Sequence, residues 1–256
     1  MTENKLRKFI SKPKEPPSGK RTHQPIILTD SKGNYWKNYA CHDVGKQIVW
    51  LPKSGAKIED STQWLKSNIS RKIINYGDIW LYVWMGTCNL TSTNKKYISL
   101  KSANDEEVDK IISKYNEIIK IINRYPGTKV IFLETPVYSI KNGNESKGHK
   151  DPNVFVEQDE NLSKLIYTLN GKVRNINNSP GTHSPYISSD LRAKDKYRCG
   201  KDRTLKTNKY YNFKLYSDGI HADSLLSKTW LRKISEQAKR DCWESISNST
   251  RTNQSQ

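Results

Sequence analysis

The stretch PIILTDSKGN, residues 25–34, passes from an apolar segment directly into a polar turn. Its apolar part, Ile26 to Leu28, is typical of a short β-strand. The polar part that follows can be a simple turn, a phosphate cradle or the position of a nucleophilic serine. The stretch alone does not decide between these, so the residues that follow the other strands of the chain must be compared with it.

Three further apolar segments have the composition of strands, and amphipathic segments separate them. The strand-like segments are residues 47–51, 78–85 and 129–133. Helical periodicity covers residues 58–69, 105–124, 162–169 and 225–234. Strands that alternate with helices predict an α/β fold, with three layers (α/β/α) around a central, mostly parallel sheet.

The chain of 256 residues is strongly basic, with a formal net charge of +18 and a pI of about 9.6. Such an excess attracts polyanions. Two interpretations stay open: a lysine-rich surface without a specific partner, or a surface that contacts nucleic acid, because basic charge alone does not locate a site. Aromatic residues make up 10% of the chain, which argues against full disorder.

The two ends of the chain differ in composition from its middle. Residues 1–24 are basic, contain prolines and lack apolar periodicity, so we expect a flexible arm there. Residues 244–256 form a polar tail, and residues 25–243 are expected to form one domain. The N-terminus lacks the apolar core of a secretory signal, and no segment approaches the roughly 20 apolar residues that span a bilayer. We therefore expect an intracellular protein, cytoplasmic or nuclear, without a membrane partner.

The cysteines give no sign of a metal site. Cys41, Cys88, Cys199 and Cys242 form no C-x-x-C pair, and none has a histidine at zinc-finger spacing. We expect reduced thiols and no bound metal.

Unusual polar turns follow the first three strand-like segments, and a fourth precedes the last helix. The turns are residues 29–34, 52–56, 86–91 and 217–221. In parallel α/β sheets the ligand site lies beyond the carboxyl ends of the strands, where the first three turns are expected to meet.

A strand-end serine, a glycine, a Gly-Thr-x-Asn turn and an Asp-x-x-His in this order resemble the SGNH hydrolases, which are GDSL-type esterases and lipases. The resemblance covers residues 26 to about 235 and implies a flavodoxin-like fold and hydrolysis of carboxylic esters without a cofactor. Ser31 matches the nucleophile of the family and His221 its base. Asp218 matches the carboxylate that orients the histidine. The backbone N–H groups of Ser31 and Gly55 match two donors of the oxyanion hole.

The third oxyanion donor departs from the family pattern. The family has Gly-x-Asn, whereas Cys88 stands at the asparagine position here and Asn89 follows it. Either Asn89 reaches the site through a shift of one residue, or the amide donor is missing and Cys88 offers only a weak thiol donor. Lys32, beside the nucleophile, suggests an anionic substrate or a surface that binds something other than a lipid, and Asp30 is interpreted as structural.

The stretch LRAKDKYRCGKDRTLKTNKYYNFK, residues 191–214, mixes cations with tyrosines. It is either a solvated loop or, with the N-terminal arm, a contact for RNA or DNA. The candidate nucleic-acid contacts are Lys194, Tyr197, Arg198, Lys201, Arg203, Lys206, Lys209 and Tyr210.

The second hypothesis for the function follows from that stretch. It is a nucleic-acid-binding protein that keeps the SGNH fold with weak or no catalysis. The segments FLETPVYSI and NFKLYSDGIH resemble esterase-like open reading frames of mobile elements. Residues 135–160 are either a lid or an exposed insertion, and the oligomeric state is left open.

Overall fold

The computed structural model describes residues 2–37, 39, 43–199 and 204–244. Its centre is a sheet of four parallel strands in the order β2-β1-β3-β6. The strands are β1 (Gln24–Thr29), β2 (Val49–Pro52), β3 (Ile79–Trp84) and β6 (Lys129–Phe132). Every residue of β1 and of β3 is buried, as expected for strands covered on both faces.

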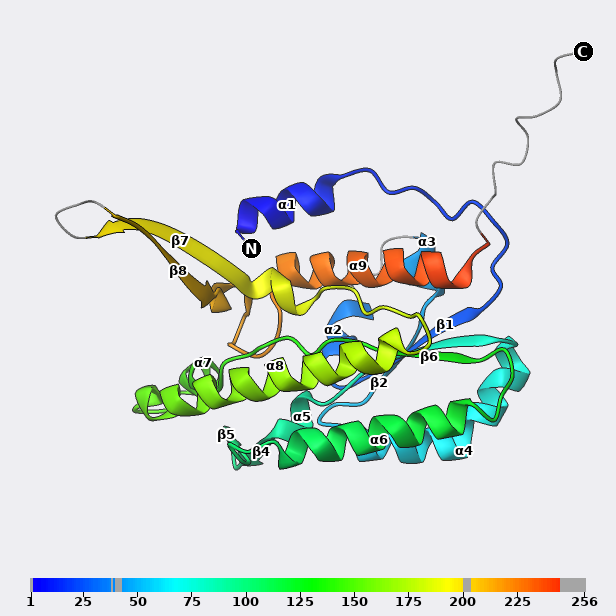
Figure 1. The fold of residues 1–256 in the computed structure, drawn as a ribbon, viewed down its shortest axis with the longest axis horizontal. Helices are drawn as coiled ribbons and strands as arrows, with labels where there is room; N and C mark the ends of the chain where they lie inside the picture. The colour runs from blue at the N-terminus through cyan, green and yellow to red at the C-terminus, as the bar shows by residue number, and fades with distance from the viewer. Residues whose placement is uncertain (1, 38, 40–42, 200–203, 245–256) are drawn as a thin grey trace, which may run out of the picture.

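Helices cover both faces of this sheet (Figure 1). On one face lie α4 (Ile58–Tyr76) and α6 (Glu106–Ile122), and on the other lies α9 (Ser224–Cys242). The short helices α2 (Lys32–Lys37) and α3 (Asp43–Gln47) pack near α9, and α8 (Val156–Asn178) runs beside β6. The expected three-layer α/β/α fold is therefore confirmed. Among the described residues, no helix is long and apolar enough to cross a membrane.

The apolar face of α6 shows how the sequence builds one of these layers. Val108, Ile111, Tyr115 and Ile118 recur at steps of three or four residues and are all buried. Acidic side chains occupy the first turn, where their negative charge stabilises the positive end of the helix dipole. The helix ends four residues before Pro126, which lacks the N–H that a continuing helix needs.

The N-terminal segment is a correction to the expected flexible arm. Residues Glu3–Ser11 form helix α1, which packs against α9, and Leu6 is completely buried. The buried guanidinium of Arg232 donates hydrogen bonds of 2.7–3.0 Å to four carbonyl oxygens. These belong to Phe9, Ile10, Lys12 and Pro13. The anchoring residue lies about 220 positions away, so local composition does not reveal it.

Between β3 and α6 lie the short elements α5 (Thr87–Leu90), β4 (Thr91–Asn94) and β5 (Tyr97–Leu100). Residues 135–160, between β6 and α8, include α7 (Ile140–Ser146), the 3-10 helix η1 (Pro152–Phe155) and the start of α8. Val137, Tyr138 and Ile140 are buried in the core. The segment 135–160 is thus an integral wall of the domain near the carboxyl ends of the strands.

At three places in the described part of the chain, asparagine side chains of the helices hydrogen-bond to buried backbone groups that no neighbouring strand pairs. The amide of Asn177 in α8 accepts from the N–H of Phe132 (3.0 Å) and donates to its carbonyl oxygen (2.8 Å). Asn170 binds both backbone groups of Thr135 in the same way, and Asn144 binds those of Ile98. Each amide therefore replaces one pair of hydrogen bonds of a neighbouring strand.

The segment expected to be a loop at 191–214 is a projecting antiparallel hairpin (Figure 1). Its strands are β7 (Arg192–Cys199) and β8 (Thr204–Tyr211), flanked by the 3-10 helices η2 (Ser188–Leu191) and η3 (Phe213–Leu215). At its base the N–H of Asn212 donates to the carbonyl oxygen of Leu191 at 2.7 Å. The lysine content concealed the alternation of side chains that is typical of a strand. The polar tail expected at 244–256 lies, apart from Glu244, outside the described residues.

Candidate active site

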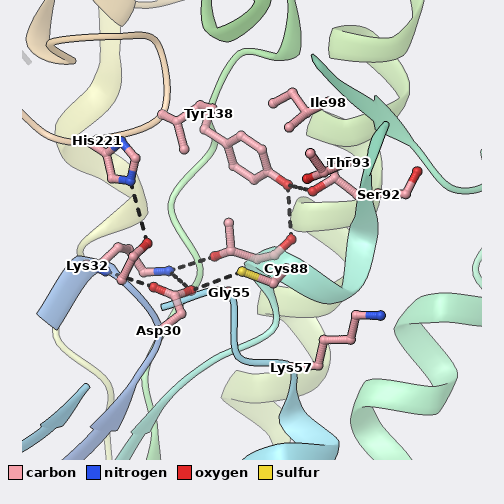
Figure 2. Close-up of a pocket in the computed structure, with 14 residues that line it drawn as sticks. Asp30, Lys32, Gly55, Lys57, Cys88, Ser92, Thr93, Ile98, Tyr138 and His221 are labelled. Carbon is pink, nitrogen blue, oxygen red and sulfur yellow. Dashed lines mark hydrogen bonds and ion pairs between the residues drawn. The ribbon is translucent and has the colours of Figure 1, made fainter. Parts of the chain in front are cut away.

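A pocket of about 440 Å³ lies at the carboxyl ends of the central strands (Figure 2). Its wall includes Ser31 from the end of β1, Gly55 from the turn after β2, Thr87 and Cys88 from α5, and His221 from the loop before α9. The fold therefore brings the first three turns together, as the parallel sheet predicts, and the turn before α9 joins them.

The turn after β1 positions Ser31 through local hydrogen bonds. The N–H of Lys32 donates to Asp30 Oδ1 at 3.0 Å, and the N–H of Gly33 donates to the carbonyl oxygen of Asp30 at 3.2 Å. A Cβ atom on Gly33 would lie 2.1 Å from Cγ2 of Thr29, so a larger residue here would force the Thr29 side chain to move. The polar residues after β1 therefore form a tight turn that carries Ser31.

Ser31, His221 and Asp218 lie in contact in that order. Ser31 Oγ is 3.5 Å from His221 Nε2, and His221 Nδ1 is 2.7 Å from Asp218 Oδ2. The first separation is long for a hydrogen bond. A displacement of well under ~1 Å brings it to the roughly 2.6–3.2 Å at which a base takes a proton from a nucleophile.

The loop that carries Asp218 and His221 is held rigidly. Asp218 Oδ1 accepts from the N–H of His221 (2.7 Å) and of Ile220 (3.0 Å). The N–H of Ser217 donates to the carbonyl oxygen of His221 at 2.8 Å. Gly219 has φ 82°, and a Cβ there would lie 2.6 Å from the backbone nitrogen of Gly143. Both the turn and the contact with α7 therefore require glycine at this position.

The hydrogen bonds around Asp218 also set its protonation state. Burial by itself raises the pKa of this carboxyl, but hydrogen bonds from the His221 ring and from two backbone N–H groups outweigh it. Together they lower the pKa of Asp218 to about 2. Asp218 is therefore an anion near neutral pH, able to hold the Nδ1–H tautomer of His221 and to stabilise an imidazolium.

Two residues expected to supply oxyanion donors lie in the pocket wall. Ser31 and Gly55 both line the pocket. Within the described residues, neither N–H donates to a protein acceptor. Unpaired N–H groups beside a nucleophile are the donors that acyl transfer requires.

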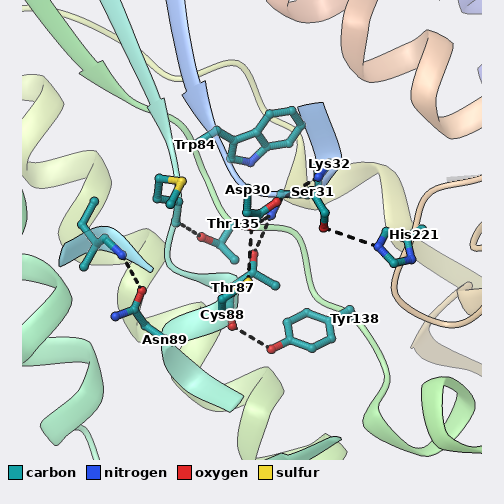
Figure 3. Close-up of polar contacts among 12 residues, drawn as sticks. Asp30, Ser31, Lys32, Trp84, Thr87, Cys88, Asn89, Thr135, Tyr138 and His221 are labelled. Carbon is teal, nitrogen blue, oxygen red and sulfur yellow. Dashed lines mark hydrogen bonds and ion pairs between the residues drawn. The ribbon is translucent and has the colours of Figure 1, made fainter. Parts of the chain in front are cut away.

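Lys32 lies below Ser31 and is paired inside the protein, so its charge does not by itself support the expectation of an anionic substrate. Its side chain is only 9% exposed. Its ammonium group forms an ion pair with Asp30, whose side chain is 2% exposed, and donates to Thr87 Oγ1 at 2.8 Å (Figure 3). The charge of Lys32 is therefore balanced within the core and is not offered to a substrate.

Within residues 2–37, 39, 43–199 and 204–244, no group of three or more His, Cys, Asp or Glu side chains is arranged to hold a metal ion.

Comparison with known proteins gives matches only at the level of structure. No family model matches the chain, and no curated protein matches its sequence. A protein described as a candidate acylhydrolase from Bacteroides fragilis superposes with a TM-score of 0.54 at 14% identity, over 92% of this chain and 94% of that one. A GDSL-like lipase from Bacteroides thetaiotaomicron gives 0.54 at 12% identity, over 84% and 87%. The lipase/acylhydrolase from Enterococcus faecalis gives 0.51 at 8% identity, over 88% and 100%.

The chain has the SGNH hydrolase fold. At these identities the likeness is one of fold, and the roles of individual residues do not follow from it. None of the three structures is described as a product of a mobile element, so that part of the sequence resemblance finds no support among them.

In this SGNH fold the position of Asn89 excludes one of the two alternatives for the third oxyanion donor, a shift of one residue that brings Asn89 into the site. The Asn89 side chain is buried, accepts from the N–H of Ile58 at 2.9 Å and donates to Glu59 at 3.0 Å. Figure 3 shows it directed away from Ser31 and His221. Asn89 therefore caps the start of α4 and does not reach the pocket.

Cys88 lies in the pocket wall, but its thiol is already engaged. Its Sγ lies 4.0 Å from Asp30 Oδ2, to which the S–H donates. Burial, and then the negative charge of Asp30, raise the pKa of Cys88 to about 11. The thiol therefore stays protonated near neutral pH and is unsuited to act as a nucleophile.

Sequence reasoning missed two residues of this pocket. Thr87 accepts from Lys32, and the Tyr138 hydroxyl donates to the carbonyl oxygen of Thr87 at 3.0 Å. Thr87 was visible only as the variable position of the Gly-x-Asn turn. Tyr138 comes from the segment before α7, for which no sequence signal indicated a place in the site.

The candidate nucleic-acid contacts lie on the hairpin, whose second strand ends at Tyr211, shortly before the turn of residues 217–221. Lys194, Tyr197, Arg198, Lys206, Lys209 and Tyr210 are all exposed residues of β7 or β8. Lys201 and Arg203 lie outside the described residues.

Proposed function

We propose that this protein is a serine hydrolase of carboxylic esters, with Ser31 as nucleophile and His221 as general base. The observation that carries the proposal is the pair of contacts that joins Ser31 Oγ to His221 and His221 to Asp218 at the pocket wall. The SGNH fold, which the chain shares with lipases and acylhydrolases, supports it.

The reaction proceeds in two halves. Ser31 Oγ attacks the ester carbonyl carbon while its proton passes to His221 Nε2, and the carbonyl electron pair moves onto the oxygen. The N–H groups of Ser31 and Gly55 stabilise that oxyanion. When it collapses, the C–O bond to the alcohol breaks, and the alcohol leaves with the proton from His221. Water then repeats the sequence on the acyl-enzyme and releases the acid.

The pocket favours a small acyl group. Its volume of about 440 Å³ is near the lower end of small-molecule sites, which span roughly 300–1,000 Å³. Ile98, Tyr138 and Ile220 give it an apolar side next to the nucleophile. Acetyl and other short acyl esters fit these dimensions.

The first test is hydrolysis of p-nitrophenyl acetate by the wild type and by Ser31→Ala and His221→Ala. Each substitution removes a partner of the proton transfer, so kcat is expected to fall by at least about a thousandfold. Ser67→Ala and His183→Ala change the same residue types at exposed positions and should leave kcat unchanged. Full activity in Ser31→Ala would overturn the proposal.

Labelling by a fluorophosphonate probe tests the nucleophile independently of the choice of ester. The wild type is expected to form a stable adduct on Ser31, and Ser31→Ala is expected to form none. Adduct formation on another residue would assign the nucleophile elsewhere.

A second candidate function, binding of single-stranded nucleic acid, rests on the charge pattern of the hairpin. In the β7–β8 register, side chains directly opposite each other share one face. One face carries Arg192, Lys194, Lys196, Arg198 and Lys209, and no carboxylate among its described residues. Lys194 lies directly opposite Lys209, an arrangement that costs stability unless an anion occupies the face. Exposed Tyr197 and Tyr210 on the other face can stack on bases.

This second candidate is tested with a fluorescent single-stranded RNA or DNA oligonucleotide at several salt concentrations. The triple variant K194Q/K196Q/K209Q is expected to reduce the slope of log K against log salt by about 2, since each lost phosphate contact removes roughly 0.7. The triple variant K46Q/K120Q/K164Q removes the same charge from exposed positions elsewhere and should change the slope less. Equal effects, or equal binding to anionic vesicles, would contradict a nucleic-acid site on the hairpin.

A further inference from the structure

The proposed reaction needs a side-chain donor for the oxyanion, and the two residues that the sequence offers for it are both engaged. Asn89 binds the start of α4, and the Cys88 thiol donates to Asp30. A site with the two backbone donors alone would lose about a hundred- to a thousandfold in rate relative to one with three. A side-chain donor for the oxyanion must therefore come from another residue of the pocket wall.

The buried ammonium of Lys32 fixes which way the Thr87 hydroxyl points. An ammonium group has three hydrogens to donate and no lone pair with which to accept. Because Lys32 Nζ lies 2.8 Å from Thr87 Oγ1, the threonine oxygen accepts this bond, and its own hydrogen must point elsewhere. Within the described residues, no protein acceptor takes that hydrogen.

The position of Thr87 leaves the pocket as the place for that hydrogen. Thr87 lines the same pocket as Ser31 and His221. Its backbone is held by the bond from the Tyr138 hydroxyl to its carbonyl oxygen. Figure 3 shows the side chain between the Asp30–Lys32 pair and the ring of Tyr138.

The contact with Lys32 also makes Thr87 a better donor than an ordinary threonine. A hydroxyl that accepts a hydrogen bond from a cation is polarised and donates more strongly, and the effect is larger where water is excluded. Lys32 and Asp30 are both almost completely buried. The ion pair thus lies behind the hydroxyl and directs its hydrogen outward.

We propose that the Thr87 hydroxyl, supported by the buried Lys32–Asp30 pair, donates the side-chain hydrogen bond to the oxyanion in place of the asparagine of the SGNH pattern. The assignment rests on the proposed hydrolase function. Thr87 is then a catalytic residue, and Lys32 is a positioning residue that acts through it.

The test compares Thr87→Val, Thr87→Ala and Thr87→Ser in steady-state hydrolysis of p-nitrophenyl acetate. Valine keeps the shape and removes the hydroxyl, so kcat is expected to fall by about 10²–10³ with KM nearly unchanged. Alanine should show a loss of the same order without a methyl group against Lys32. Serine restores the hydroxyl and should stay within a few-fold of wild type. Thermal unfolding of each variant verifies that it is folded.

The outcomes separate this assignment from the proposed function. If Ser31→Ala is inactive while folded Thr87→Val or Thr87→Ala retains wild-type kcat, the Thr87 assignment is wrong and the hydrolase stands. If Thr87→Ser loses as much as Thr87→Val, the residue is structural and the assignment is again wrong. If the wild type neither hydrolyses esters nor reacts with a fluorophosphonate, the hydrolase proposal fails and the assignment fails with it.

Discussion

The lysine beside Ser31 and the lysines of the hairpin are the same kind of side chain in opposite surroundings. Lys32 is buried against Asp30 and Thr87, with Trp84 5.9 Å from its ammonium group. Lys194 and Lys209 are exposed and lie opposite each other. Sequence reasoning offered an anionic partner as one of two alternatives for each region. The difference shows that the counter-charge within reach, and not the residue type, decides whether a cation supports the core or a binding surface.

The largest effect expected from this contrast is on stability. Lys32→Met leaves the Asp30 carboxylate buried without its counter-ion, which costs about 3–5 kcal/mol of the free energy of unfolding. Lys209→Met removes an exposed charge and should change it by less than about 0.5 kcal/mol. Denaturant unfolding of both variants measures the difference.

The double variant D30N/K32M controls for loss of side-chain volume. It removes both charges, so it should recover part of the stability that Lys32→Met loses. Equal stabilities of Lys32→Met and Lys209→Met would show that Lys32 is solvated, and the contrast would be lost.

A smaller effect on the free energy of unfolding is expected from the Asp218 carboxylate. The pKa of Asp218 in the folded protein is about 2, below the 3.8 of an unperturbed aspartate. Its stabilisation is therefore complete above about pH 4 and is lost as the pH falls through 2. Once solvent screening of this partly exposed group is allowed for, the contribution is on the order of 1 kcal/mol. The stability difference between the wild type and Asp218→Asn should shrink between pH 5 and pH 2.

Urea unfolding at several pH values measures this difference. Asp195→Asn, which changes an exposed carboxylate of the hairpin, serves as the comparison variant. A wild-type to Asp218→Asn difference that stays constant down to pH 2 would contradict the lowered pKa.

A still smaller effect, of opposite sign, is expected in the hairpin. Lys194→Glu replaces a like-charged pair with an opposite-charged one across from Lys209, a gain of roughly 0.2–1 kcal/mol for the hairpin. Because the hairpin can open locally, amide hydrogen exchange of β7 and β8 is the suitable measurement. Lys206→Glu, opposite Tyr197, is the matched control and should slow amide exchange in the hairpin less than Lys194→Glu does. Faster exchange in Lys194→Glu would mean that Lys194 and Lys209 do not oppose each other.

The smallest effect is expected from removing most of the hairpin. Joining Ala193 to Tyr210 by an Asn-Gly turn keeps the first rungs and the bond between Asn212 and Leu191. Esterase activity and the thermal midpoint should stay close to wild type, while any binding of oligonucleotides is lost. A large fall in kcat would show that the hairpin belongs to the active site and would remove the distinction between the two regions.

The central sheet was predictable because its signals are local. The apolar runs around Ile26, Trp80 and Ile131 are long enough to indicate strands, and parallel topology then places the turns after β1, β2 and β3 at one edge. The contact of Ser31 with His221 followed from the order of the motifs. Their catalytic roles stay a prediction.

The parts that sequence reasoning missed depend on partners distant in the chain. Arg232 anchors α1, Asp159 binds Ser139 and the start of α7, and Thr87 meets Lys32 across 55 positions. No propensity or periodicity encodes such pairs, since each is created only when the elements pack. Lys32 is the clearest case. A lysine that follows Ser31 in the sequence looks the same there whether its side chain points into the core or toward a substrate.

The hydrogen bonds of Asn177 to β6 affect how readily two copies of the protein can pair through their sheet edges. An uncovered edge strand is a template on which a second chain can add its own backbone. By holding both groups of Phe132, the amide of Asn177 ends the sheet there and withdraws one rung of that template. A single side chain thereby helps to keep separate copies of the protein from joining edge to edge at high concentration.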